Sequence, residues 1–312
     1  MTLAAMGEFG LINRVTARLG TSPATLVGPG DDAAVIAVPD GRVVATTDVL
    51  VEGRHFRCDW SSATDIGHRA AAANLADISA MGGVATALLV GLCMPPDLDP
   101  RWAEQLADGL SAEAESVGAA VVGGDMARSQ VITIAVTALG ELNGPAAVLR
   151  SGAEPGDIVA MAGRIGHAAA GYTVLSRGFR SPKVLVEAYR RPAVPYWAGP
   201  AGAKLGATSM IDVSDGLLAD LGHIAESSGV GIDVRRDVFE VTQPMRDASS
   251  ALGVDPYTWI LSGGEDHPIV ATFPAGTPLP AEWLVIGRVM DGAGVTVDGK
   301  MHTGVTGWDH FR

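Results

Sequence analysis

The chain has 312 residues, of which 47% are hydrophobic, so it is long enough to bury a sizeable core and to form two domains. Its 22 basic and 35 acidic residues give a formal net charge of −13, and the basic residues form no run. Nucleic acid and anionic membranes require a cationic surface, so neither is expected as a principal partner. A phosphorylated ligand is therefore expected to bind through metal ions.

The cysteines and lysines exclude further classes of protein. Cys58 and Cys93 show neither CxxC nor zinc-ligand spacing, and the three lysines lie outside any glycine-rich strand-to-helix turn, which excludes a Walker-type P-loop. The first residues lack a basic segment followed by an apolar core, and the longest apolar run, residues 84–94, is too short to cross a bilayer. A cytoplasmic location is expected.

Hydrophobic periodicity predicts the elements of the first half of the chain. Helices are predicted at residues 8–19, 62–81 and 100–117, and strands at 35–38, 43–47, 84–92, 119–122 and 131–139. The turn at residues 39–41 predicts that the first two strands pair as a hairpin. The second helix is expected to end at Gly82 and Gly83, since glycine tolerates the left-handed conformation.

Turn-forming residues gather at 140–154, and they predict a boundary between a domain of residues 1–145 and one of residues 146–312. Beyond this boundary, strands are predicted at residues 158–161, 208–211, 231–234, 268–272 and 283–289, and helices at 166–177 and 214–228. The alternation of strands and helices favours an α/β or α+β layer fold.

Several aspartates directly follow a predicted strand, beside glycine or a small polar residue: Asp31, Asp32, Asp48, Asp125, Asp212 and Asp215. Each one alone is explained by a turn or a helix cap. Together they would share a crevice if the carboxyl ends of the strands converge. Clustered carboxylates without a His/Cys set favour Mg²⁺, which in turn implies nucleotide phosphates. Asp77, an acid within the alanine-rich helix, supports this interpretation.

Other residues are candidates for ligand contact. The glycines at 28–30, 123–124 and 263–264 could let backbone N–H groups approach phosphate oxygens, although ordinary tight turns also explain them. His55 and His267 lie beside charged residues in glycine-containing loops. Arg150 is the candidate cation for a phosphate outside the metal cluster.

Eight motifs carry a family resemblance along essentially the whole chain: GPGDDAAV, TTDVLVEGRHF, NLADISAMGG, GGDMAR, LRSGAEPGD, DVSDGLLADL, SGGEDH and GWDHF. In this order they resemble bacterial thiamine-monophosphate kinases, within the superfamily of ATP-binding enzymes similar to aminoimidazole ribonucleotide synthetase. The resemblance implies a two-domain α/β fold whose N-terminal domain binds ATP and magnesium and forms a homodimer through its sheet. It also implies ATP-dependent phosphorylation of thiamine monophosphate to thiamine diphosphate, assisted by several Mg²⁺ ions.

The resemblance assigns a role to each matching position. The implied metal ligands are Asp32, Thr46, Thr47, Asp48, Asp77, Asp125, Asp212 and Asp215. The implied ATP contacts are Gly124, Asp125, Arg150 and Ser214, and the implied contacts to the thiamine moiety are His55, Glu265 and Trp308. Thr46 stands where some members have serine, and His267 where tyrosine is usual. Neither departure removes an oxygen ligand.

The implied chemistry needs no protein base, because the acceptor is a phosphate with a second pKa near ~6. Direct in-line transfer is the expected mechanism, and a phosphohistidine at His55 is the rival one. Trp308 could stack on the thiazolium ring, and Glu265 could bond the aminopyrimidine. Two other functions remain open, a nucleotide-binding regulator without turnover and a metal-dependent phosphohydrolase. A selenophosphate-synthetase-like function is disfavoured, because no cysteine or lysine precedes Gly28.

Overall fold

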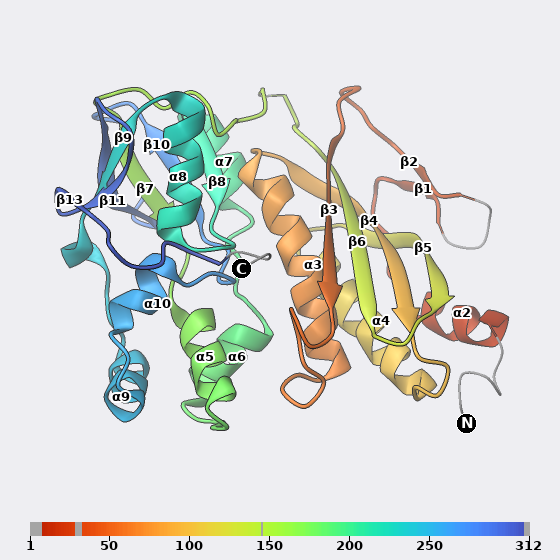
Figure 1. The fold of residues 1–312 in the computed structure, drawn as a ribbon. Coiled ribbons are helices and arrows are strands. Elements are labelled where there is room, and N and C mark those ends of the chain that lie inside the picture. Colours follow the sequence, from red (N-terminus) through yellow and green to blue (C-terminus); the bar gives the residue numbers. More distant parts are fainter. Residues whose placement is uncertain (1–7, 29–32, 145, 309–312) are drawn as a thin grey trace. The chain divides into compact units, whose positions relative to one another are not determined.

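The computed structural model describes residues 8–28, 33–144 and 146–308, and it has the mixed α/β fold that the sequence predicts (Figure 1). The chain divides into two compact units. Unit 1 consists of Met1–Ile78 and Gly83–Gly144, and unit 2 of Ser79–Gly82 and Pro145–Arg312. Across the described residues, none of the helices has the length and apolarity needed to cross a membrane.

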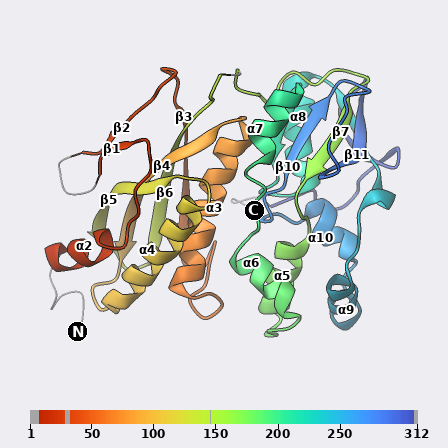
Figure 2. The same cartoon turned by 180° about the vertical axis from the view of Figure 1, so that it is seen from behind.

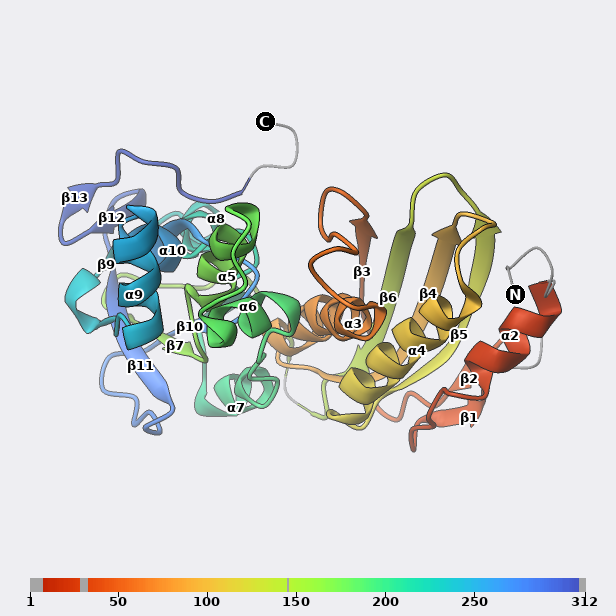
Figure 3. The same ribbon diagram turned by 90° about the horizontal axis from the view of Figure 1, so that it is seen from below.

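Unit 1 is built on a four-stranded sheet in the order β3-β6-β4-β5. Two long helices, α3 and α4, lie along one face of this sheet (Figures 2 and 3). The elements of this unit are α2 (Glu8–Thr16), β1 (Thr25–Val27), β2 (Val35–Ile36), β3 (Val44–Val51), α3 (Ala63–Ala80), β4 (Val84–Met94), α4 (Pro100–Glu115), β5 (Ala120–Arg128) and β6 (Thr133–Glu141). The last residues of α3, Ser79 and Ala80, belong to unit 2.

The two long helices have the ends that their sequences predict. Gly82 follows α3 at φ +80°, and the N–H of Gly83 donates to the carbonyl of Ile78, a bond that satisfies a C-terminal carbonyl of α3. Asp99 caps α4, because its carboxylate accepts from the N–H of Arg101 at 3.0 Å and Pro100 occupies the first helical position.

The predicted hairpin across residues 39–41 is wrong. In the structure β2 pairs with β1, whereas β3 pairs antiparallel with β6 over eight residues. The two-residue strand β2 offers few ladder hydrogen bonds, so the longer pairing with β6, far away in the sequence, decides the position of β3. Strand β1 was not predicted at all.

Two strands of unit 1 extend further than predicted, and this corrects the position of two aspartates. Asp48 lies within β3 and Asp125 within β5, not after the strands that contain them. The expected convergence at strand ends therefore does not apply to these two residues. Asp212, predicted directly after a strand, is the last residue of β8 (Ser209–Asp212) and so does lie at a strand end.

Unit 2 contains a seven-stranded sheet in the order β13-β12-β9-β11-β7-β10-β8. Its remaining strands are β7 (Ile158–Ala162), β9 (Gly231–Val234), β10 (Ile269–Phe273), β11 (Trp283–Met290), β12 (Gly294–Val297) and β13 (Lys300–Met301). Its helices are α5 (His167–Ser176), α6 (Lys183–Arg190), α7 (Ala198–Leu205), α8 (Leu217–Ser228), the 3-10 turn η1 (Arg236–Val238), α9 (Gln243–Leu252) and α10 (Pro256–Ser262). Strands β8, β9 and β10 are buried at every residue, which indicates cover on both faces.

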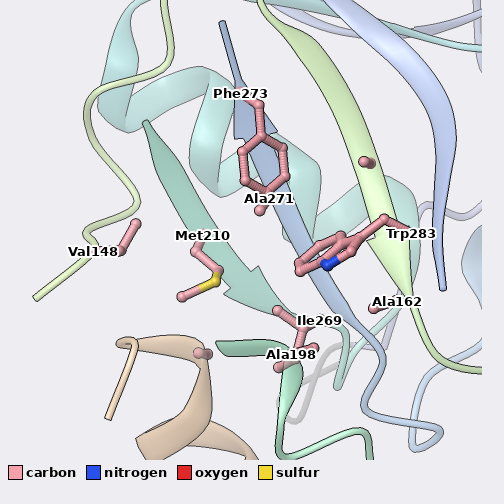
Figure 4. Close-up of a cluster of buried hydrophobic side chains, with 10 residues drawn as sticks. Val148, Ala162, Ala198, Met210, Ile269, Ala271, Phe273 and Trp283 are labelled. Atoms are coloured by element: carbon pink, nitrogen blue, oxygen red, sulfur yellow. The ribbon is translucent and has the colours of Figure 1, made fainter. Parts of the chain in front are cut away.

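A hydrophobic core lies between this sheet and α7 (Figure 4). Trp283 and Phe273 meet edge to face, with ring centroids 5.3 Å apart, and Met210 and Ile269 fill the space beside them. Ala198 closes the core from α7. Helix α8 lies on the other face of the sheet (Figures 1 and 2).

Four helices of unit 2 were missed from the sequence. No helix is predicted over residues 191–200, which are rich in proline, yet α7 begins at Ala198 within this stretch. Helices α6, α9 and α10 are short, with seven to ten residues each, so their periodicity is weak. The sequence does contain the start signal of α10, because Asp255 caps it and Pro256 follows.

Candidate functional site

In unit 1 the structure brings Thr46 and Asp77 together. Thr46 lies in β3 and Asp77 in α3, and the Thr46 hydroxyl donates to Asp77 Oδ2 at 2.6 Å. Asp48 lies two residues further along β3 and therefore on the same face of the sheet as Thr46. Its backbone N–H donates to the side-chain oxygen of the fully buried Asn74 at 3.1 Å. Two predicted metal ligands therefore share one face of β3, and a third, Asp77 of α3, is bonded to one of them.

Thr47 points the other way. Its hydroxyl donates to the carbonyl of Val136 at 3.0 Å and accepts from the hydroxyl of Thr137 at 3.1 Å, on the face of the sheet opposite to Thr46. A metal ion beside Thr46 and Asp48 could contact Thr47 only through its main-chain carbonyl.

Asp125 lies at the opposite edge of the same sheet. The register places Asp48 level with Gly124, across β6 and β4, and three strand spacings of about 4.8 Å separate them by about 14 Å. The next residue, Asp125, points to the face opposite to Asp48, and its side chain is exposed. One metal ion cannot contact both carboxylates of a single chain.

Gly124 has a packing reason to be glycine. A Cβ atom at this position would lie 2.1 Å from the carbonyl oxygen of Val90 in the neighbouring strand β4. Any side chain would therefore force β5 away from β4. The glycine is required by the pairing of these strands, whether or not its N–H also approaches a phosphate.

His55 is held by the loop that follows β3. Its ring Nδ1 accepts from the backbone N–H of Val51 at 3.0 Å. The backbone N–H of His55 donates to the carbonyl of Val51 at 2.9 Å. Because Nδ1 accepts, the neutral ring carries its hydrogen on Nε2. His55 is thus arranged to donate a hydrogen bond from Nε2.

In unit 2, two loops lie side by side. The N–H of Glu265 donates to the carbonyl of Ser214 at 2.9 Å, and the N–H of His267 donates to the carbonyl of Val213 at 3.2 Å. A Cβ atom on Gly264 would lie 1.8 Å from the carbonyl oxygen of Ser214. These contacts extend the pairing of β8 with β10 beyond the sheet, and they bring the predicted residues at 212–215 next to Glu265.

The C-terminal segment lies against the same loop. The N–H of Trp308 donates to the carbonyl of Asp215 at 2.9 Å, and the Trp308 side chain is 59% exposed. Unit 2 therefore collects five of the predicted site residues in one place: Asp212, Ser214, Asp215, Glu265 and Trp308.

The charges of this part of the molecule are predominantly negative. Asp212 Oδ2 lies 2.9 Å from Nδ1 of His267, and both side chains are buried. Asp220, from the first turn of α8, accepts from the N–H groups of Asp215 and Gly216 at 3.1 and 3.0 Å. Burial, and then the nearby carboxylates of Asp212 and Asp215, raise the pKa of Asp220 to about 7. A cation would relieve this repulsion.

One predicted site residue, Arg150, lies elsewhere in unit 2. The carbonyl of Arg150 accepts from the Ser228 hydroxyl at the C-terminal end of α8, whereas Ser214 precedes the N-terminal end of this helix. The twelve residues of α8 separate these ends by about 18 Å. Asp32, another predicted metal ligand, lies outside the described residues.

The donor set fits magnesium. Within residues 8–28, 33–144 and 146–308, no three His, Cys, Asp or Glu side chains gather closely enough to hold a metal ion by themselves. The available donors are carboxylate and hydroxyl oxygens in small groups, such as Asp77 with Thr46 and the carboxylates around Asp220. Mg²⁺ is commonly bound by one or two carboxylates together with phosphate oxygens and water.

Sequence reasoning missed three side chains that hold these segments. Asn74 binds the backbone of β3, Asp220 binds the loop after β8, and Asp266 binds the start of α5 through the N–H of Ala168 at 2.9 Å. The signal for Asn74 and Asp220 in the sequence was a polar residue among mainly apolar neighbours, whereas Asp266 stands between two other polar residues and had no such signal. Nothing in the sequence could indicate which backbone groups they would reach, because these groups come from other elements.

Asp266 gives the protein a pH-dependent stability. Burial raises its pKa to about 6 from the ordinary 3.8, against the opposing effects of the N–H of Ala168 and of Arg164, His167 and His267. The folded state therefore binds this proton more tightly than the unfolded state, so the stabilising contribution is lost as the pH rises through about 4 to 6.

The quantity of interest is the free energy of unfolding of the unmodified protein minus that of Asp266→Asn. We expect this difference to fall by about 1 kcal/mol between pH 5 and pH 7. Urea unfolding at both pH values measures this difference. A difference at pH 7 that is equal to or larger than the difference at pH 5 would contradict this prediction.

The amino-acid sequence is similar to a known family model and to known proteins. A family model described as AIR synthase related protein, N-terminal domain, matches residues 30–142. A thiamine-monophosphate kinase of Mycobacterium tuberculosis is 48% identical over 313 aligned positions, which cover 99% of this chain and 93% of that protein.

Two solved structures extend the similarity to the fold. The crystal structure of thiamine-monophosphate kinase from Stenotrophomonas maltophilia superposes with a TM-score of 0.83 at 33% identity, covering 95% of this chain and 98% of that chain. The structure of AaThiL complexed with AMPPCP and TMP superposes with a TM-score of 0.82 at 33% identity, covering 100% of this chain and 99% of that chain. Both similarities span the two units.

Proposed function

The chain belongs to the thiamine-monophosphate kinase family, and we propose that it transfers the γ-phosphoryl group of ATP directly to thiamine monophosphate with the help of several Mg²⁺ ions. The activity itself, ATP-dependent formation of thiamine diphosphate, follows from membership. The observation that carries it is the similarity over the full chain to a relative bound to an ATP analogue and TMP.

The groups of unit 1 and unit 2 have distinct roles in this proposal. Asp48, Asp77 and Thr46 would hold magnesium in unit 1, as would Asp212 and Asp215 in unit 2. Magnesium, when bound, would neutralise the negative charge on the phosphates. Asp32, Thr47 and Asp125 complete the proposed ligand set, and Gly124, Arg150 and Ser214 the proposed nucleotide contacts.

The chain's own residues position the acceptor. The Nε2 hydrogen of His55 would donate to the substrate, Glu265 would bond the aminopyrimidine, and the exposed ring of Trp308 would stack on the cationic thiazolium. The acceptor phosphate is already largely ionised at neutral pH, with a second pKa near ~6, so it attacks without a protein base. Positioning in line with the γ-phosphorus is then the main task of the protein.

The geometry of His55 favours direct transfer over a phosphohistidine. The Nδ1 lone pair is occupied by the N–H of Val51, and Nε2 of the neutral ring carries the hydrogen, so neither nitrogen offers a ready lone pair to phosphorus. Incubation with γ-labelled ATP in the absence of acceptor is expected to leave the protein unlabelled. Acid-labile label on His55 would overturn this part of the proposal.

We also propose that the protein is a homodimer joined through unit 1. On the face of the sheet opposite to α3 and α4, Val49 of β3 and Leu89 of β4 are 48% and 37% exposed, and Asp125 lies on this face at the edge strand β5. Burying such a face against a second copy is favourable. The separation of Asp48 from Asp125 within one chain supports the same proposal, since a partner could supply the missing carboxylate.

Leu89→Glu is expected to convert the protein to a monomer at concentrations where the unmodified protein is a dimer, because it places a charge on the proposed interface. Light scattering after size-exclusion chromatography measures the mass. Leu284→Glu changes a similarly exposed leucine of unit 2 and should leave the dimer intact. A monomeric unmodified protein, or a dimeric Leu89→Glu, would refute this interface.

Phosphorus NMR of the protein with ATP, Mg²⁺ and thiamine monophosphate tests the reaction, with parallel samples that lack the acceptor or the metal. Equal amounts of thiamine diphosphate and ADP, formed only in the complete mixture, are expected. Free phosphate without thiamine diphosphate would indicate hydrolysis instead. A cytoplasmic location is part of the proposal, because ATP is available there.

A further inference from the structure

The loop that carries Glu265 is held in an unfavourable backbone conformation. Glu265 and His267 have φ values of 72° and 51°, in the left-handed region that residues other than glycine rarely adopt. Such conformations persist only where the surrounding structure enforces them. The backbone N–H groups of both residues are bonded to the loop after β8, and Asp266, which lies between them, adds side-chain contacts on another element.

Asp266 is bound at the start of α5. Its side chain is 3% exposed, and Oδ2 accepts from the N–H of Ala168 at 2.9 Å. Gly166, the N-cap of α5, has no capping side chain, so the carboxylate of Asp266 takes this role from a distant part of the sequence. A negative charge at this position is also favoured by the helix dipole.

The second oxygen of Asp266 faces Arg164. Oδ1 lies 3.8 Å from Arg164 Nε, which is an ion-pair distance and too long for a hydrogen bond. Both atoms are buried, and neither has a hydrogen-bond partner among the described residues. A buried carboxylate with one unbonded oxygen contributes little to the free energy of unfolding, because its loss of hydration is not fully compensated. This favours a role in fixing the local conformation.

We propose that Asp266 is a positioning residue for thiamine monophosphate. It anchors the loop to α5, maintains the left-handed conformation of Glu265, and so holds the Glu265 carboxylate where the aminopyrimidine binds. This inference rests on the proposed role of Glu265. Asp266 itself does not touch the substrate.

The test compares Asp266→Asn with Asp233→Asn. Asp233 is a buried carboxylate of the same unit that accepts from Thr296 Oγ1 and from the N–H of Gly299, both at 2.7 Å, at the β12–β13 hairpin. The readouts are KM for each substrate, kcat, thermal unfolding, and calorimetric binding of thiamine monophosphate without ATP. The unmodified protein is measured alongside. If it shows no turnover, the proposed reaction has failed, and this outcome is distinct from failure of the positioning role of Asp266.

Asp266→Asn is expected to raise KM and Kd for thiamine monophosphate at least about tenfold, with KM for ATP changed less than about twofold. Asp233→Asn is expected to lower the melting temperature without this selective change. Equal rises of both KM values, no rise for thiamine monophosphate, or the same selective rise in Asp233→Asn would overturn the proposal.

If Asp266→Asn does not fold, Arg164→Gln decides the question. It removes the cation beside Oδ1 but leaves the carboxylate and its bond to Ala168, and Arg164 is partly exposed. A smaller but selective rise in KM for thiamine monophosphate is expected. An unchanged value in the folded variant would overturn the proposal.

Discussion

Replacing Asp125 with asparagine is expected to lower kcat at least about a hundredfold, equivalent to about 3 kcal/mol, while the melting temperature changes little. Asp125 is a proposed ligand for magnesium, and asparagine removes the charge that the metal ion neutralises. Its side chain is exposed on β5, outside the core of unit 1, so the fold should tolerate the change. Steady-state kinetics over a range of Mg²⁺ concentrations measure the effect.

Asp97→Asn is the matched control. Asp97 is also an exposed aspartate of unit 1, in the loop between β4 and α4, and its substitution removes the same charge. It is expected to leave kcat within about twofold. An Asp125→Asn protein that retains more than a third of its turnover would refute the assignment of Asp125 as a metal ligand.

Gly264→Ala is expected to abolish the activity and to destabilise the protein by more than about 3 kcal/mol. The added Cβ atom would lie 1.8 Å from the Ser214 carbonyl oxygen and 2.7 Å from its carbonyl carbon, so the two loops of unit 2 cannot stay together. This separation would displace Glu265 from Ser214. Thermal unfolding and the phosphorus NMR assay measure both effects.

Gly222→Ala provides the control for this substitution. Gly222 lies within α8, and a Cβ atom there would meet no heavy atom within 4 Å apart from the helix's own nearby backbone. Alanine is a better helix former than glycine by up to about 1 kcal/mol, so this variant should be as stable as the unmodified protein or more stable. A Gly264→Ala protein that behaves like Gly222→Ala would show that the loops can separate without loss.

The elements with strong local signals could be predicted. The long helix α3 was expected at residues 62–81 and runs over Ala63–Ala80, because alanine content and the following glycines act within one segment. The hairpin at residues 39–41 was wrong, since the partner of β3 is β6, about ninety residues away. Pairing over such a distance depends on the whole sheet, and a turn motif cannot reveal it.

For the site, the sequence indicated which types of residue would take part, but not which of them lie next to one another. It indicated that Asp212, Ser214, Asp215 and Glu265 are site residues, and the structure places them on adjacent loops of unit 2. It also suggested that aspartates after strands converge, which fails for Asp48 and Asp125. Their strands extend past them, and the sheet separates the two residues onto opposite faces and opposite edges.

The sequence by itself determined the family and the mixed α/β fold, because motif residues and hydrophobic periodicity are properties of continuous segments. It also predicted oxygen ligands for magnesium. Only the tertiary structure decided that Thr46 bonds Asp77, that Thr47 faces away, that Val51 sets the tautomer of His55 and that Asp266 holds the Glu265 loop. The bonds of Thr46, Thr47 and Asp266 join segments far apart in the sequence, so they form only when strands, helices and loops have packed together. The bond of His55 spans four residues and depends on the turn that follows β3.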